Sequence, residues 1–400
     1  MFYTKARWNV SSHLDRAAPL AASALAALLL FGSVAPNEAR GQVASATAIF
    51  LMIEPDSRSA GMGNTGVALA DNANAIFWNP AGLGFQRGTE FGLTHSTWLP
   101  KLNAGLYYEY LVGKHHIDGV GTVGGHVTYL FLGQHECRTA NNVLCGTFNS
   151  YDLAAGATFA RQFSDRFSLG TSVRGIYSKL ADGRKNLSVK PGISVGVDLA
   201  GLYRSSTFDL GGIDTRARAG FNLANMGPSI SYLEADSASA PDPIPTNLRF
   251  GYSFTFDFDE YNSLTFSNDF TKILTDVQEE VQGDSLVAGE PRPWYEAIFS
   301  SWRSIQVDPN TSDTDPGRKL SVIDQLLIGV GAEYWYNQLF ALRGGYFYEH
   351  PFNGNREFLT LGAGLRYNIF GVDFSYIYAL EENNPLANTM RFSVLFNLGE

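Results

Sequence analysis

Apolar and polar side chains alternate with a period of two through the C-terminal part of the chain. In segment 338–350, Leu342 falls on the apolar face and Arg343 on the opposite face, and segment 388–398 likewise places Phe392 opposite Arg391. A strand with this pattern needs an apolar partner for one face and a polar environment for the other. The wall of a transmembrane β-barrel meets both needs, because its outer face contacts lipid and its inner face lines a polar lumen.

Strands of this kind recur along most of the chain, and we predict an all-β fold, a 14-stranded antiparallel transmembrane β-barrel over residues 88–400. The predicted strands are 88–99, 103–112, 117–132, 150–163, 166–179, 190–203, 214–224, 246–257, 261–271, 321–335, 338–349, 356–368, 370–380 and 388–398. Outer-membrane barrels have an even number of strands, short periplasmic turns and long outer loops. If the first strand runs outward, every long connection except 204–213 falls on the outer side.

The predicted outer loops are 100–102, 133–149, 180–189, 225–245, 272–320, 350–355 and 381–387. Loop 272–320 is the longest, and loops of this length are usually functional or disordered. Trp294, Ile298, Phe299 and Trp302 follow Pro293 at the spacing of one helical face, so we predict a helix over 292–306. An aromatic helix in an outer loop is a candidate partner-binding element, although it could instead only pack over the mouth of the lumen.

Composition agrees with a barrel and excludes two other classes of protein. Charged residues make up 17% of the chain and 41 residues are glycine, whereas soluble domains are about 25% charged. Outside the N-terminus no apolar run approaches the roughly 18 residues of a membrane-spanning helix, so a helical membrane protein is excluded. The net charge of -10 argues against nucleic acid as a partner, because phosphates require a basic surface.

Residues 1–41 have the features of a secretory signal peptide. Lys5 and Arg7 precede the apolar stretch 17–35, and small residues flank Arg40 just before Gln42. Cleavage after Ala35 or after Ala39 is an alternative. A signal peptide followed by a transmembrane β-barrel predicts that the protein is exported and lies in the outer membrane.

The two cysteines of the chain, Cys137 and Cys145, are eight positions apart in one polar stretch. An exported protein meets an oxidising compartment, so we predict a disulfide bond within this outer loop. Metal binding would need more ligands than this pair offers, although His135 is close by.

Residues 42–87 do not alternate and are rich in turn-forming residues, notably in stretches 58–66 and 77–83. They are too compact for a disordered tail and too irregular for strands. We predict that they form a small N-terminal plug inside the lumen.

Short motifs of several enzyme and ligand-binding classes occur, but their contexts are wrong. Residues 61–66 match a dinucleotide fingerprint without the preceding strand or the later acid, and 192–196 match a nucleophile elbow that lies in mid-strand. Residues 308–319 begin like a calcium loop but lack its glycine and its final glutamate. We predict no catalytic residue, no cofactor and no metal site, and weak cation binding by Asp308, Asp313 and Asp315 stays open.

Asn79, Pro80 and Ala81, placed in a plug ahead of fourteen strands, resemble the hatch signature of the FadL family of outer-membrane channels. A longer resemblance is to the PorV (LptO) proteins, FadL-like barrels of the Bacteroidetes type IX secretion system. It is carried by segments 59–63, 75–83, 332–336, 340–350, 384–389 and 391–393. The chain departs from these proteins in its ending, Leu398-Gly399-Glu400, and in its cysteine-containing loop.

This resemblance implies a shuttle without enzymatic activity in the outer-membrane lipid. Proteins of this kind receive cargo by its C-terminal signal domain from the type IX translocon barrel and deliver it to a surface attachment complex that includes a sortase-like protease. The resemblance implies no cofactor. Loop 272–320 would be the candidate contact surface, because its aromatic helix could enter a groove in a partner.

The alternative is a FadL-type channel for the uptake of hydrophobic small molecules. Such a channel needs a continuous apolar passage past a movable plug, whereas a shuttle needs a filled lumen. The inward-facing charged residues favour a polar lumen and therefore the shuttle; they are Arg343, Glu349, Arg366, Asp373 and Arg391.

Overall fold

The computed structural model describes residues 46–102, 104–138, 141–181, 189–233, 241–282, 285–306, 319–381 and 384–399, with the backbone alone at Cys145, 278–282, 285–289 and Gln306. All of them belong to the compact unit Arg40–Glu400. The predicted signal peptide 1–41 and the predicted calcium-like residues 308–315 lie outside the described residues.

Fourteen strands of the described chain form a closed antiparallel barrel, which confirms the predicted fold class. Each strand pairs with its neighbours in sequence, β1 pairs with β19, and β6 pairs with β8 across the two-residue strand β7 (Phe208–Asp209). The barrel strands are β1 (Thr89–Thr97), β2 (Tyr107–Ile117), β3 (Gly121–Arg138), β4 (Leu144–Ser164), β5 (Phe167–Lys179), β6 (Gly192–Arg204), β8 (Asp214–Met226), β9 (Asn247–Asp257), β10 (Asn262–Ile273), β15 (Leu326–Tyr336), β16 (Phe340–Tyr348), β17 (Glu357–Tyr367), β18 (Phe370–Ala379) and β19 (Met390–Asn397).

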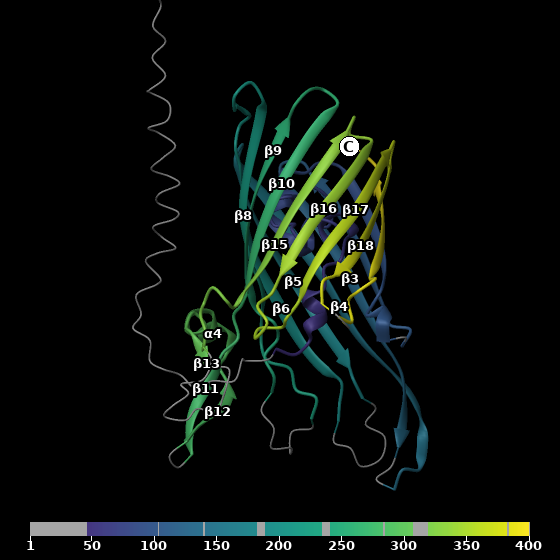
Figure 1. Cartoon of the computed structure of the whole chain (residues 1–400), viewed down its shortest axis with the longest axis vertical. Coiled ribbons are helices and arrows are strands. Elements are labelled where there is room, and N and C mark those ends of the chain that lie inside the picture. Colours follow the sequence, from purple (N-terminus) through teal and green to yellow (C-terminus); the bar gives the residue numbers. More distant parts are fainter. Residues whose placement is uncertain are drawn as a thin grey trace, which may run out of the picture. The chain divides into compact units, whose positions relative to one another are not determined.

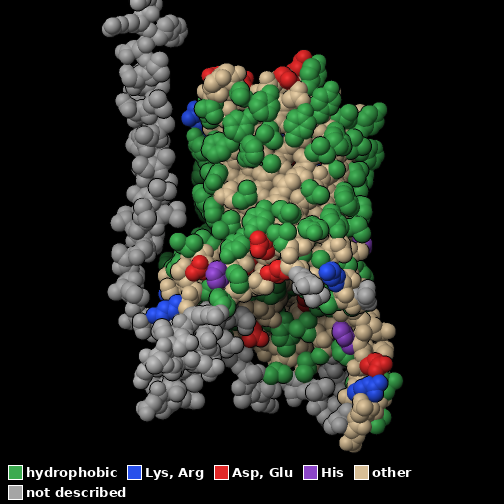
Figure 2. Space-filling view, viewed as in Figure 1, with side chains coloured by type: hydrophobic (Ala, Val, Ile, Leu, Met, Phe, Trp, Pro, Cys, Tyr) green, Lys and Arg blue, Asp and Glu red, His purple; other side chains and the backbone are tan. Residues whose placement is uncertain are grey.

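The alternation in the sequence becomes an alternation between lipid and lumen. In β5, exposed and buried residues follow one another almost without exception, and the exposed ones include Leu169 and Val173. The first four residues of β16 alternate in the same way, with Leu342 exposed and Arg343 buried. Figure 2 shows the result on the visible face of the barrel, where apolar side chains cover most of the wall.

Short turns and one longer segment, 205–213 with β7, join the strands at one end of the barrel. The long loops lie at the other end, which is called the outer end here (Figure 1). The short turns occupy 118–120, 165–166, 258–261, 337–339 and 368–369. Asn337, Gln338 and Asn368 adopt positive φ angles of 53°, 50° and 51° in two of these turns, the left-handed conformation that asparagine tolerates better than most residues.

Two predicted outer loops contain regular structure that the sequence did not indicate. The predicted loop 133–149 is mostly a hairpin, because β3 continues to Arg138 and β4 begins at Leu144, with irregular pairing after Phe131 and after Cys137. These residues are polar because both faces of the hairpin meet water, and backbone pairing does not require apolar side chains. Figure 1 shows the hairpin reaching past the outer end.

The long outer loop runs from 274 to 325 and has its own small elements. They are the hairpin of β11 (Val277–Gln282) and β12 (Ser285–Pro291), the helix α4 (Trp294–Ser300), and the paired strands β13 (Ile305–Gln306) and β14 (Lys319–Leu320). The predicted helix over 292–306 is therefore too long. It ends after Ser300, and Arg303 turns back to form an ion pair with Asp276 at 2.9 Å.

Residues 46–86, called the plug from here on, line the inside of the barrel. They form the short helices η3 (Ile49–Met52), α2 (Ser57–Ala60), α3 (Ala75–Trp78) and η4 (Pro80–Phe85), and a further short helix, η5 (Pro100–Leu102), follows β1. None of the helices in the described part of the chain is long and apolar enough to cross a membrane.

The buried core lies between the plug and the barrel wall. Met62, Ile76 and Leu83 of the plug have no exposed surface. Glycines in the wall allow the plug backbone to come close: a Cβ atom at Gly345 would lie 2.1 Å from the Gly63 nitrogen, and one at Gly170 would lie 2.4 Å from the Pro80 carbonyl carbon. The high glycine content is thus partly explained by this close approach of two backbones.

Candidate functional site

The plug runs through the barrel from one end to the other. Near its start, the Thr47 backbone N–H donates to the Pro243 carbonyl at 2.9 Å, in the outer connection between β8 and β9. At its other end, Gln86 accepts from the Thr122 hydroxyl at 3.3 Å, next to the short turn between β2 and β3. The chain therefore enters the lumen at the outer end and leaves it at the end where β1 begins.

A chain of ion pairs connects the plug to the wall. The Arg58 guanidinium donates to both carboxylate oxygens of Glu333 in β15, at 2.8 and 2.7 Å. Arg343 in β16 also donates to Glu333 at 2.7 Å and reaches Asp373 in β18 at 2.8 Å, and Arg366 completes the chain on Asp373. The side chains of Arg343 and Glu333 are 0% and 1% exposed, so the charges neutralise one another away from bulk water.

Asp71 extends this network within the plug. It pairs with Arg58 at 2.5 Å and with Arg218 of β8 at 3.1 Å. The side chain of Asp71 is 37% exposed. Its partial desolvation acts to raise its pKa, but the nearby charges of Arg58 and Arg218 outweigh this effect, and the pKa lies below its ordinary value of 3.8. Asp71 is therefore ionised at neutral pH, as these pairs require.

Side chains of the wall also bind backbone N–H groups of the plug. One carboxylate oxygen of Asp269 in β10 accepts from Gly66 and Val67 at 2.7 and 2.9 Å. Thr360 of β17 accepts from Gly63 at 2.8 Å, and Glu90 of β1 accepts from Ala73 at 2.8 Å. These contacts meet the hydrogen-bonding needs of a plug that has little regular secondary structure.

The predicted plug motif lies deep in this interface. Asn79 is fully buried, and its side-chain amide donates to the carbonyls of Val67 and Gly201 at 3.1 Å each. Its side-chain oxygen accepts from the Ala81 N–H at 3.1 Å, and Pro80 is the first residue of η4. The Ala81 carbonyl accepts from Ser168 of β5 at 2.7 Å. Such contacts fit a structural role for the motif, and that role stays a prediction.

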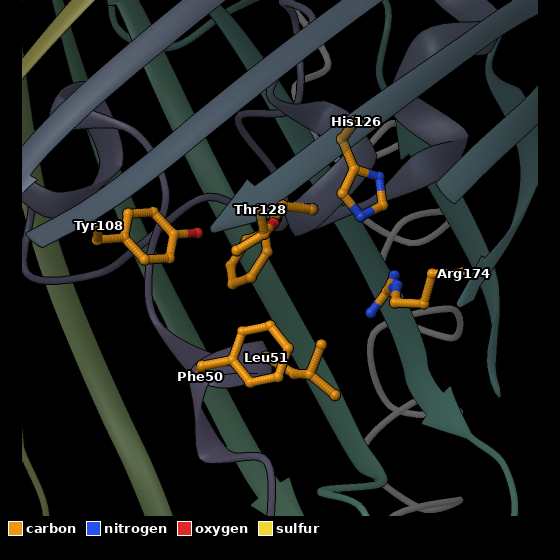
Figure 3. Close-up of a pocket in the computed structure, with 7 residues that line it drawn as sticks. Phe50, Leu51, Tyr108, His126, Thr128 and Arg174 are labelled. Carbon is orange, nitrogen blue, oxygen red and sulfur yellow. The ribbon is translucent and has the colours of Figure 1, made fainter. Parts of the chain in front are cut away.

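A small pocket remains between the plug and the wall (Figure 3). His126 and Arg174 lie on one side of it, Tyr108 lies on the other, and Phe50 and Leu51 of the plug lie along one edge. Its volume of about 10 Å³ is room for about one water molecule. Arg174 Nε and His126 Nδ1 are buried without a hydrogen-bond partner among the described residues, which fits a water and not an organic solute.

At the outer end, polar side chains hold the long loop to the barrel rim. Lys272 at the end of β10 donates to the Gln325 side chain at 2.7 Å, and Gln325 in turn donates to the Arg303 carbonyl at 2.8 Å. Asp276 pairs with Arg292 at 3.2 Å and with Arg303 at 2.9 Å, on the two sides of α4. The loop is thus closed at its base and α4 has a defined place on it.

The four predicted partner-binding residues do not share one exposed face. Trp294 and Ile298 are half-buried, whereas Phe299 is 77% exposed and Trp302 is 38% exposed. Trp302 lies beyond the end of α4, and its indole N–H donates to the Ile298 carbonyl at 2.8 Å. Tyr295, which the sequence analysis did not select, is exposed beside Phe299.

The predicted disulfide partners lie on the two strands of the protruding hairpin. Cys137 is opposite Gly146, and Arg138 is opposite Leu144, so the backbone of Cys145 lies across from Cys137 and its neighbour. The side chain of Cys145 is outside the described residues, and the disulfide bond stays a prediction.

The enzyme-like motifs have the contexts expected of structural segments. Gly63 of the 61–66 stretch packs against the backbone of β16, and Ser194 of the 192–196 stretch lies within β6, donating to the Pro228 carbonyl at 2.6 Å. Among the described residues, no group of three or more histidine, cysteine, aspartate or glutamate side chains could hold a metal ion.

Four acidic residues hold the plug without a sequence pattern that predicts this role: Glu333, Asp269, Glu90 and Asp71. The available signal was an acidic residue at an inward-facing position in a predicted strand, as for Glu333 in 321–335. That signal places a carboxylate in the lumen but does not name its partner.

Solved structures that are similar to this chain include two toluene transporters and a FadL homologue. The Pseudomonas putida toluene transporter TodX is 13% identical with a TM-score of 0.50, over 87% of this chain and 99% of that one. The Ralstonia pickettii toluene transporter TbuX is 17% identical with a TM-score of 0.44, over 86% and 96%. A Pseudomonas aeruginosa FadL homologue is 12% identical with a TM-score of 0.39, over 86% and 98%. At 13% identity, the likeness to TodX supports the fold alone.

A comparison with curated proteins found no match. A family model described as "Type IX secretion system protein PorV" matches residues 35–280, more than half of the chain. This match and the barrel place the protein in the outer membrane. The chain belongs to the PorV family and is an outer-membrane component of the type IX secretion system.

Proposed function

We propose that this barrel is a shuttle for secreted proteins. It receives cargo by the C-terminal signal domain as the cargo leaves the type IX translocon barrel and delivers it to a surface attachment complex that includes a sortase-like protease. Membership of the PorV family supports a role in this secretion system. The transfer steps and the individual partners are our proposal, as is the absence of any chemical reaction on this chain.

The close packing of the plug against the barrel wall is the observation that carries the proposal. Arg58, Glu333 and Arg343 form an ion-paired layer between plug and wall, and the pocket of Figure 3 has room for about one water molecule. With the plug packed in this way, the barrel offers protein partners its outer loops and its outer wall. This packing favours the binding of partners at the outer surface over the passage of small molecules through the lumen.

The long outer loop is the proposed contact surface for cargo or translocon. Phe299 and Tyr295 of α4 are exposed, and exposed aromatic residues are enriched at protein interfaces. Asp276 holds both flanks of α4, so this helix is positioned before a partner arrives. A positioned contact surface loses less conformational entropy on binding than a flexible loop does.

A deletion strain tests the shuttle. We expect cargo precursors to remain in the periplasm with their C-terminal domains attached, while the translocon barrel is still made. Normal cargo release by the deletion strain would reject the proposal. The alternative, a FadL-type uptake channel, predicts normal secretion and instead a loss of growth on, or sensitivity to, a hydrophobic compound.

A pair of substitutions tests the contact surface. Tyr295→Ser with Phe299→Ser should reduce co-purification of cargo or translocon from membranes, because it removes exposed rings without touching the barrel strands. The matched control is Phe352→Ser, an exposed aromatic residue on the loop between β16 and β17. Equal co-purification of the double variant and the control would reject the assignment to α4 and leave the shuttle itself in place.

A further inference from the structure

We propose that the plug stays bound to the barrel wall throughout the working cycle of the protein, as a fixed strut and not as a gate. The inference concerns residues 46–86 and their contacts, and it rests on the proposed function only for its cellular readout. It differs from the behaviour of an uptake channel, where the plug must move to open a passage.

Both ends of the plug are tied to the barrel. At the outer end, the Thr47 N–H binds the Pro243 carbonyl, and the Thr47 hydroxyl lies 3.3 Å from that of Tyr232. At the other end, the Lys114 ammonium donates to the carbonyl of Arg87, immediately after the plug. Release of the plug from the barrel therefore requires that the contacts at both of its ends break.

Between its ends, the plug is held by strands on all sides of the barrel. The polar contacts described above come from β1, β5, β10, β15 and β17. In addition, the Ser57 N–H donates to the Ser393 hydroxyl of β19 at 2.9 Å, and the two hydroxyls are also 2.9 Å apart. A hinge would leave one side of the plug attached and the other free, whereas here the attachments surround it.

The shapes of plug and wall also interlock. Gly331 and Gly345 of the wall lie against Met62 and Gly63, so close that a Cβ atom at either position would approach the plug backbone within 2.3 Å. Movement along the barrel axis would carry the buried Met62 side chain over strand positions that have side chains. Close-packed interfaces of this kind do not slide without local unfolding.

Electrostatics act in the same direction. Withdrawal of the plug would remove Arg58 from Glu333, whose side chain is 1% exposed, and would separate Asp269 from two backbone N–H donors. Each carboxylate would then lack a partner that its burial requires. Arg343, the other arginine that contacts Glu333, is already paired with it.

A disulfide cross-link tests the proposal in cells. The 2.9 Å separation of the Ser57 and Ser393 hydroxyls places cysteines at these positions within reach of each other. Ser57→Cys with Ser393→Cys therefore joins plug to wall in the oxidising compartment. The matched control, Thr94→Cys with Ser393→Cys, uses hydroxyls 2.7 Å apart and joins β1 to β19. It removes the Ser393 hydroxyl from Ser57 as the test pair does, but it leaves the plug without a cross-link.

With the plug cross-linked, cargo release should stay within about twofold of the control strain. The proposal is overturned if release falls about tenfold or more on oxidation and returns on reduction while the control is unaffected, because such a loss shows that the plug must move.

Hydrogen exchange on the purified full chain gives a test that needs neither cargo nor substitutions. We expect the amides of Gly63, Gly66 and Val67 to exchange as slowly as those of β10 and β17, to which they are bound. Exchange about 100-fold faster than these strands would overturn the proposal, because it would show independent opening of the plug. If the deletion strain secretes normally, the shuttle function fails but this test still decides the state of the plug.

Discussion

The lumen and the outer loops of this barrel use the same ion-pair chemistry in very different surroundings. Arg343 and Glu333 in the lumen are 0% and 1% exposed, whereas Arg138 and Glu136 on the outer hairpin are 48% and 56% exposed, and both pairs have an N–O distance of 2.7 Å. Equal geometry therefore does not mean equal energy. Removing one partner of a buried pair costs several kcal/mol of folding free energy, because the remaining charge is left without water, whereas the remaining charge of an exposed pair is hydrated (about 0–1 kcal/mol).

This difference in exposure distinguishes the part of the molecule that maintains the fold from the part that can bind partners. The lumen pairs join plug and wall into one body. The ion pairs of the outer loops lie at the surface, where partners can reach them. Asp276 is intermediate in exposure, because its own side chain is buried but the arginines that it pairs with are about one-third exposed. We infer that the inner network maintains the fold and that the outer surface supplies the contacts of the proposed shuttle.

The largest expected effect comes from removing a shared buried carboxylate. Glu333→Ala should lower the free energy of unfolding by about 3–5 kcal/mol, because it leaves Arg58 and Arg343 with fewer partners in the lumen. Unfolding by denaturant in detergent would measure this effect. The control is Glu357→Ala, where the side chain of a partly exposed acid accepts from the Tyr346 hydroxyl. Equal losses in the two variants would contradict the proposed difference between lumen and rim.

Loss of the predicted disulfide bond should have the next largest effect, and this effect concerns the outer hairpin. Replacing Cys137 and Cys145 by serine should cost about 2–3 kcal/mol of local order at most, seen as faster hydrogen exchange in β3 and β4 beyond the barrel. The barrel itself should assemble as before. Two free thiols in protein isolated without reductant, found by mass spectrometry, would refute the bond.

Acid should weaken the contacts of Asp71. Its pKa is lowered in the folded protein, so its contribution to stability is present above its ordinary value of 3.8 and is lost as the pH falls through the lower, folded value. The difference in unfolding free energy between the parent and Asp71→Asn should therefore shrink as the pH is lowered from 7 to below 3.8. A difference that is constant over this range would show that the charge of Asp71 is not what holds it.

The smallest effect is expected on the exposed hairpin. Glu136→Ala should change the unfolding free energy by less than about 1 kcal/mol, because its partner Arg138 is hydrated in either case. High salt should have little further effect on this variant. A loss as large as that of Glu333→Ala would mean that exposure does not govern these pairs.

Most strand positions could be predicted because the signal for them is local. A side chain that faces lipid must be apolar wherever its strand pairs, so Leu342 and Phe392 carry information that needs no knowledge of their neighbours. The hairpin of β3 and β4 beyond Phe131 carried no such signal, since both of its faces meet water. For α4, the spacing of Trp294, Ile298 and Trp302 fitted a helix longer than the seven residues that form it.

The candidate site was only partly predictable. Asn79, Pro80 and Ala81 were identified by resemblance, and Arg343 and Asp373 could be assigned to the lumen from alternation. Their partners could not be named, because Arg58 and Glu333 are 275 positions apart in sequence. Separations of 203 and 202 positions likewise hid the contacts of Asp269 with Gly66 and Val67.

The sequence by itself determined the barrel, its number of strands and its direction of alternation, since each depends on whether one residue faces lipid or lumen. Only the tertiary structure decided how the plug is held, because that depends on which strands the closed ring brings to opposite sides of residues 46–86. Burial then decides what each charge contributes: enclosure by the wall makes the pairing of Arg58 and Glu333 obligatory, while open water leaves Arg138 and Glu136 almost free of consequence for the fold.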